Sequence, residues 1–110
     1  MDQVLMILTN MPDEASAGSI AHAVVERGLA ACVNVLPAVR SIYRWQGAVE
    51  QAGEVTLMIK TTQQRYPALE AAIKATHPYE VPEIIAIPIV AGLPAYLDWV
   101  ASETQKELDV

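Results

Sequence analysis

The sequence lacks most of the features that would mark it as secreted, membrane-bound or nucleotide-binding. Its 110 residues include one cysteine, Cys32, so no disulfide can form within the chain, and this favours a reducing compartment. The five glycines are scattered and form no loop that could hold a phosphate. The apolar run from Val4 to Leu8 is too short for a signal peptide or a membrane span. We therefore expect a cytoplasmic protein without a membrane partner.

Positive charge is also scarce. Seven lysines and arginines face 13 aspartates and glutamates, which gives a net charge of −6. Such a chain repels phosphate backbones, so nucleic acid is not an expected partner. Charged residues make up 18% of the sequence, below the ~25% typical of soluble domains, whereas 53% are hydrophobic. This apolar excess indicates that a partner covers part of the surface.

The hydrophobic periodicity predicts four strands and three helices. The expected strands are residues 3–9, residues 30–44, a stretch after Gly47 that ends in EVTLMIKT, and residues 83–90. Helices are expected from Pro12 to a left-handed cap at Gly28, over residues 63–76, and after Gly92 with Leu108 inward. The order βαββαβ plus a helix predicts one α+β domain, residues 1–110, with the ferredoxin-like sandwich and sheet order 4-1-3-2.

Prolines and aromatic residues indicate how such a sheet is used. Pro37 lies in the second strand and Pro88 in the fourth, which are the two expected edges, where a missing N–H group is tolerated. The first strand is apolar on both faces, but two helices cover only one face. Tyr43 and Trp45 lie on a hairpin that we expect to project and contact a neighbour. These patterns predict self-association, with both aromatic residues in the interface.

The segment HPYEVPE, residues 77–83, contains the most obvious potential metal ligands. Pro78 prevents His77 and Glu80 from sharing one helix face, and in an extended strand Glu80 and Glu83 point to opposite faces. The segment is thus no ready-made chelate. On residue chemistry alone, it is best interpreted as a helix end that leads into a strand. A lone cysteine such as Cys32 is most often a small buried hydrophobe.

Four motifs taken together resemble the divalent-cation tolerance protein family, CutA. They are LAACVNVLP, SIYRWQG, IKTT and HPYEVPEII, in this order, and the likeness extends over nearly the whole chain. The resemblance implies a ferredoxin-like subunit in a tight homotrimer, and a cytoplasmic, non-enzymatic protein linked to tolerance of copper and other divalent metals. Its architecture is similar to that of PII-type signalling trimers, which bind small ligands between subunits.

The resemblance also implies a cleft at a subunit boundary. The residues expected to gather there are Cys32, Lys60, Thr61, His77, Tyr79, Glu80 and Glu83. Some family members have a cysteine at the position of Thr9 and a histidine at that of Thr76, and this chain has neither. No cofactor is expected to be obligatory. We expect weak binding of Cu(II) or Zn(II), through His77 and Cys32, because these ions want two or more nitrogen or sulfur ligands.

Three hypotheses follow from the sequence. The first is a trimeric metal-tolerance protein, the second a PII-like sensor with a small ligand in the cleft, and the third a purely structural trimer. An acylphosphatase shares the fold, but the first loop, TNMPDEA, has no arginine to hold a phosphate. An enzyme is therefore not expected.

Overall fold

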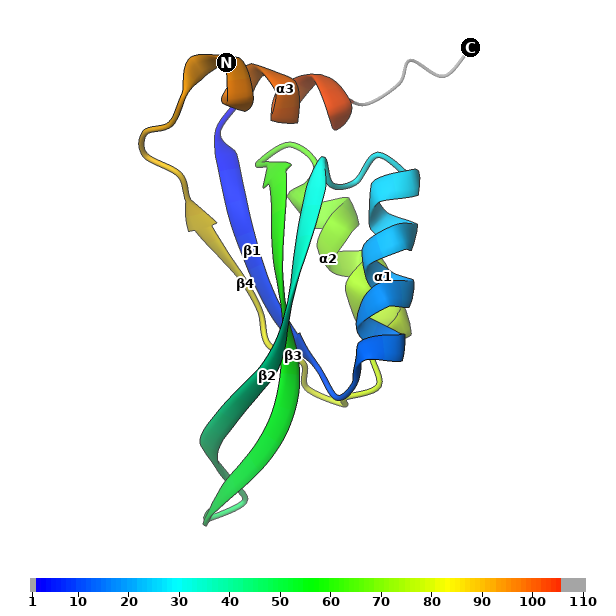
Figure 1. Cartoon of the computed structure of the whole chain (residues 1–110), viewed down its shortest axis with the longest axis vertical. Helices are drawn as coiled ribbons and strands as arrows, with labels where there is room; N and C mark the ends of the chain where they lie inside the picture. Colours follow the sequence, from blue (N-terminus) through cyan, green and yellow to red (C-terminus); the bar gives the residue numbers. More distant parts are fainter. Residues whose placement is uncertain (1, 106–110) are drawn as a thin grey trace.

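The computed structural model describes residues 2–105 and has the expected order of elements (Figure 1). They are β1 (Val4–Met11), α1 (Glu14–Glu26), β2 (Cys32–Trp45), β3 (Ala48–Thr62), α2 (Tyr66–Thr76), β4 (Ile84–Pro88) and α3 (Pro94–Glu103). The predicted α+β class and βαββαβ order with an added helix are confirmed. Leu108 lies outside the described residues. None of the helices within residues 2–105 has the length and apolar character needed to cross a membrane.

Local chemistry fixes both ends of α1. The Asp13 carboxylate Oδ1 accepts the backbone N–H of Ser16 at 2.8 Å, which satisfies one of the free donors of the first turn. The bond lowers the pKa of Asp13. At the other end Gly28 has φ 67°, the left-handed conformation that the sequence predicts there. Pro12 precedes the capping residue, so our placement of this proline in the first helical turn was wrong.

The sheet has the order β2-β3-β1-β4 with antiparallel neighbours, as predicted. Pro37 and Pro88 both lie in edge strands. Pro37 does not end β2, because the chain absorbs it in a bulge: the pairing register shifts between Leu36 and Val39, and Ala38 takes φ 62°. The β2–β3 hairpin therefore continues beyond the other strands (Figure 1).

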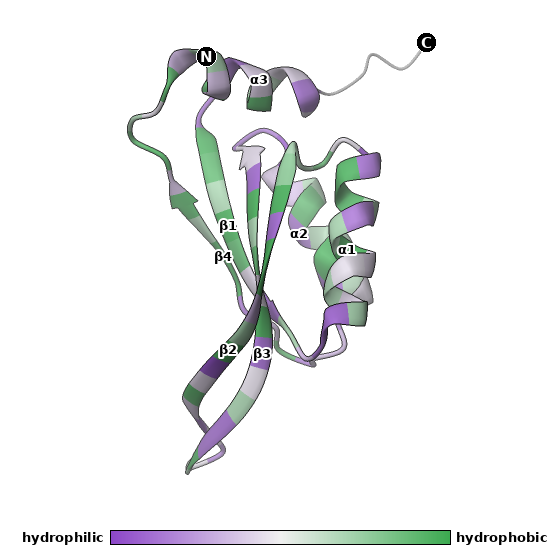
Figure 2. Ribbon diagram, viewed as in Figure 1, coloured by the Kyte–Doolittle hydropathy of each residue, from purple (hydrophilic) through white to green (hydrophobic). Residues whose placement is uncertain are grey.

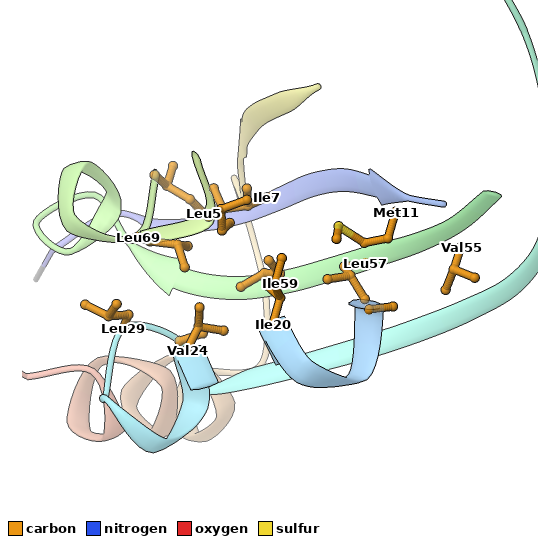
Figure 3. Close-up of a cluster of buried hydrophobic side chains, with 13 residues drawn as sticks. Leu5, Ile7, Met11, Ile20, Val24, Leu29, Val55, Leu57, Ile59 and Leu69 are labelled. Atoms are coloured by element: carbon orange, nitrogen blue, oxygen red, sulfur yellow. The ribbon is translucent and has the colours of Figure 1, made fainter. Parts of the chain in front are cut away.

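The helices α1 and α2 cover one face of the sheet, and the main core lies between these helices and the sheet (Figures 1 and 3). Its sheet side comes from alternate residues of β1 and β3, and its helix side includes the apolar stripe that periodicity predicts for α1. The buried cluster consists of Leu5, Ile7, Met11, Ala17, Ile20, Val24, Leu29, Ala30, Val55, Leu57, Ile59, Leu69 and Ile73. A single apolar core of this kind fixes the sheet against both helices.

The opposite face, which we call the outer face, is mostly uncovered in one chain. The helix α3 closes only its end, where Val100 packs on Val4 and Ala31. Beyond that, Leu8 pairs with Met58 on one side and Ile85 on the other. Figure 2 shows the hydrophobic colouring continuing along β1 and β4. The predicted second apolar face is therefore present, and α3 covers only a small part of it.

Candidate functional site

His77 connects the end of α2 to the end of β1. The next residue is Pro78, which disfavours helical backbone, and His77 is extended with ψ 134°. Its Nε2 lies 2.9 Å from the carbonyl oxygen of Asn10, which can only accept, so Nε2 carries the proton. Its Nδ1 accepts the backbone N–H of Tyr79 at 3.1 Å. Both ring nitrogens are thus engaged, and no lone pair is free for a metal.

Tyr79 attaches the same segment to β3. Its hydroxyl donates to Glu54 Oε2 at 2.8 Å, and its ring centroid lies 4.9 Å from that of His77. Burial, followed by the contact with Glu54, raises the pKa of Tyr79 to about 12. The hydroxyl therefore stays protonated at neutral pH and remains a donor. Segment 77–83 is held by β1 through His77 and by β3 through Tyr79.

A groove of about 690 Å³ lies between this segment and the hairpin. Its walls carry polar, acidic and aromatic side chains from both sides. They are Asn10, Ser41, Ile42, Tyr43, Trp45, Glu50, Glu54, Pro78, Tyr79, Glu80, Val81 and Glu83. Ligand pockets typically have volumes of ~300–1,000 Å³, so the groove is large enough for a small molecule.

Glu80 and Glu83 both line this groove. Our expectation that they point to opposite faces was wrong, because β4 begins only at Ile84 and residues 77–83 do not form a regular strand. The alternation of side chains that separates such residues in a strand does not apply to this segment. The structure therefore places Tyr79, Glu80 and Glu83 along one groove of a single chain, and their place in a cleft between subunits stays a prediction.

The remaining cleft residues lie elsewhere in the chain. Cys32 pairs with Lys60 across β2 and β3, and Lys60 Nζ donates to Asn34 Oδ1. Asn10, at the end of the groove, pairs with Thr56 of β3. Lys60 is four residues further along β3, so roughly 13 Å separates the Cys32–Lys60 pair from the groove. Within one chain Cys32 and Lys60 do not meet His77. Their gathering between subunits stays a prediction.

Thr61 has a structural role instead. Its side chain is buried on the helix side of β3, and its hydroxyl donates to the carbonyl oxygen of Leu29 at 2.7 Å. A fully buried hydroxyl with this partner cannot face a cleft on the opposite side of the sheet. Its place in the predicted cleft was therefore wrong for a single chain.

Tyr43 and Trp45 line the groove from the hairpin and remain 42% and 44% exposed. Their predicted role in a subunit interface concerns an assembly and stays a prediction. The exposure of two large aromatic rings on a projecting hairpin agrees with a role in binding, whether of a ligand or of a neighbouring chain.

Sequence reasoning missed Asn10 and Glu54. The Asn10 amide donates to Glu83 Oε1 at 3.2 Å and its Oδ1 accepts from the Thr56 hydroxyl at 2.6 Å. No local motif marks these residues. The sheet order supplied a usable signal, because it places the end of β1 beside both the start of β4 and the middle of β3.

Metal-binding side chains do not converge in the part of the chain that the structure describes. Among residues 2–105, no group of three or more histidine, cysteine, aspartate or glutamate side chains is arranged to hold a metal ion. His77 and Cys32, our predicted ligands, are separated as described above. Any metal site formed by them must therefore draw on a second chain or displace the hydrogen bonds of His77.

The bonds of His77 predict a loss of stability in mild acid. Burial lowers the pKa of His77 below its usual 6.5, against the opposing effects of Asn10 and Glu54. Below ~6.5 the unfolded chain binds a proton that the folded chain resists, so the free energy of unfolding falls as pH falls. Urea unfolding at pH 7.5 and 5.5 should show this loss. His77→Gln, which cannot titrate, should lose less, and equal losses in both proteins would exclude His77 as the source.

The sequence matches known proteins over nearly its whole length. The family model described as CutA1 divalent ion tolerance protein matches residues 5–103. The divalent-cation tolerance protein CutA of Thermus thermophilus is 49% identical over 104 residues, which are 94% of this chain and 99% of that protein. Human protein CutA is 48% identical over 98 residues, which are 89% of this chain. The chain spans about half the length of its mouse and human relatives (53% and 55%).

Solved structures agree with this result. The divalent cation tolerance protein from Thermus thermophilus superimposes with a TM-score of 0.89, covering 94% of this chain and 99% of that one. The CutA1 structure from Oryza sativa, at 35% identity, gives a TM-score of 0.92 and covers 96% and 97% of the two chains. Both the sequence and the fold are therefore shared over almost the full domain, and the chain belongs to the CutA1 divalent ion tolerance protein family.

Proposed function

We propose that this protein acts without enzymatic activity in the cytoplasm, as a homotrimer that supports tolerance of divalent metal cations, copper among them. Family membership supports the general role, since relatives such as the Thermus protein are named for divalent-cation tolerance. The proposal of an assembly rests on one observation, the uncovered outer face of the sheet.

The outer face of the sheet is more apolar than expected for a sheet surface that faces water. Ile85 and Ile87 are 47% and 38% exposed, and they lie beside half-buried Met6, Leu8 and Met58 in neighbouring strands. Contiguous apolar patches of this kind mark interaction sites in soluble proteins. We propose that copies of the same chain cover the outer face, because the projecting hairpin gives every copy a second contact surface. In a closed ring of copies, all of these surfaces are buried.

Metal contact in this proposal is weak and exchangeable. His77 already uses both nitrogens, and Cys32 pairs with Lys60 at some distance from it. Cu(II) and Zn(II) prefer a fixed array of two or more nitrogen or sulfur ligands. One such ligand from each chain gives little affinity unless ligands from neighbouring chains meet.

Calorimetric titration tests the metal part of the proposal. Cu(II) should bind the wild type weakly, and the affinity should fall as the pH drops below the lowered pKa of His77, where the imidazole takes up a proton. His77→Ala should remove most of this binding, whereas the exposed His22→Ala provides the matched control. A tight site that survives His77→Ala would show that other residues hold the metal.

A PII-like sensor is the second candidate, and the groove favours it. It combines a volume suited to a small molecule with polar and aromatic walls, and two hydrogen bonds to Tyr79 and Glu83 hold its sides in place. Preformed walls of this kind are common in ligand sites. In this role the protein binds a small molecule at the hairpin base, and the assembly reports its presence.

A further inference from the structure

The charge of the groove restricts its ligand. Four glutamates line it, Glu50, Glu54, Glu80 and Glu83, and among residues 2–105 no lysine, arginine or histidine belongs to its walls. Anions such as phosphates or carboxylates are repelled by this set of charges, whereas cations are attracted. A groove with low-dielectric aromatic walls focuses such a potential more strongly than a flat surface does.

The aromatic residues are a second and independent feature. Tyr43 lies directly opposite Glu50 in the β2–β3 pairing, so a ring and a carboxylate stand side by side on one face. Trp45 and Tyr79 add two more rings to the walls. Rings attract ammonium groups through their π faces and pack against methylene chains. A bare metal ion uses neither property, and residues 2–105 contain no three-ligand cluster to chelate one.

The spacing of the carboxylates favours an extended ligand. Glu50 and Glu54 are four residues apart on one face of β3, which corresponds to roughly 13 Å along the strand. Glu80 and Glu83 stand on the opposite wall. Two of the four are already oriented, since Glu54 accepts from the Tyr79 hydroxyl and Glu83 from the Asn10 amide. Each carboxylate keeps further lone pairs for a ligand.

From these features we infer that the groove binds a small aliphatic polyamine, with ammonium groups on the glutamates and methylene groups on Tyr43, Trp45 and Tyr79. The inference rests on the proposed role of the groove as a ligand site and names the chemical class of its ligand.

The experiment follows the fluorescence of Trp45 during a titration with spermidine. The chain has two tryptophans, and Trp99 lies on α3 away from the groove, so Trp99→Phe leaves Trp45 as the only reporter. We expect a saturable change that weakens with added salt. Glu50→Gln in this background should weaken binding about fivefold, the factor of an exposed ion pair. The matched control is Glu26→Gln, a glutamate at the end of α1.

Several outcomes would overturn the inference. They are the absence of any saturable change with spermidine, an equal effect of Glu26→Gln and Glu50→Gln, and an identical response to Mg²⁺ at the same ionic strength. Occupation of the groove by basic side chains of a second copy would also overturn it, and would appear as spermidine binding only after dilution into single chains. Light scattering on the same samples tests assembly separately, so either proposal can fail without the other.

Discussion

Replacing Met58 with lysine should separate the assembly into folded single chains. Met58 lies in the middle of the outer face, between Leu8 on β1 and Asn34 on β2, and it is half-buried in one chain. A lysine there can extend into water from a single subunit. When subunits pack face to face, the same ammonium group loses its water without a partner, at a cost of several kcal/mol for each chain. Light scattering should give 11.9 kDa for the variant and three times that mass for the wild type.

Two control variants separate assembly from folding. Val25→Lys, on α1 at 43% exposure, should keep the wild-type mass. Ile59→Lys, one residue from Met58 but fully buried under the helices, should unfold the chain. In a copper-sensitive bacterium that lacks its own family member, the wild type should restore growth and Met58→Lys should not. Retention of the wild-type mass by Met58→Lys would contradict assembly through the outer face.

Two buried threonines should respond differently to the same substitution. Thr61 and Thr9 are both fully buried, and valine has nearly the shape of threonine. The Thr61 hydroxyl donates to the Leu29 carbonyl, so Thr61→Val should lower the free energy of unfolding by about 1–3 kcal/mol. The Thr9 hydroxyl has no hydrogen-bond partner among the described residues. Thr9→Val should therefore be neutral or stabilising, because a buried donor without a partner is costly.

Urea unfolding of both variants at one protein concentration measures this difference. The wild type is the reference, and the slope of free energy against urea should not change, since neither variant alters the surface exposed on unfolding. Equal losses of stability at both positions would mean that the hydrogen bond of Thr61 contributes nothing specific.

The sequence was most informative where a pattern was local. The four buried residues of α1, Ala17, Ile20, Ala21 and Val24, follow directly from helical spacing. Pro37 and Pro88 agreed with the edge positions that the predicted sheet order gives to β2 and β4. Helical spacing and the tolerance of proline at an edge each depend only on the geometry of one element.

Long-range contacts were out of reach of the same reasoning. Asn10 accepts a hydrogen bond from His77, 67 residues away, and Glu54 accepts one from Tyr79, 25 residues away. Each requires knowledge of which strand ends meet. Local reasoning placed Glu80 and Glu83 on opposite faces because it treated residues 77–83 as a regular strand. The irregular path of this segment is set by the same distant hydrogen bonds of His77 and Tyr79.

The bulge at Pro37 and Ala38 decides which chemistry the groove contains. Before it, Cys32, Asn34 and Leu36 face away from the helices, and after it the pairing of Val39 with Glu54 moves the odd-numbered residues to that side. If all residues were kept and the strand paired without the bulge, Ile42 and Arg44 would take the places of Tyr43 and Trp45. Loss of the bulge, with no substitution in the groove, would thus turn an acidic and aromatic groove into one with its own internal cation. The bulge in this edge strand is therefore as much a determinant of ligand choice as any side chain in the groove.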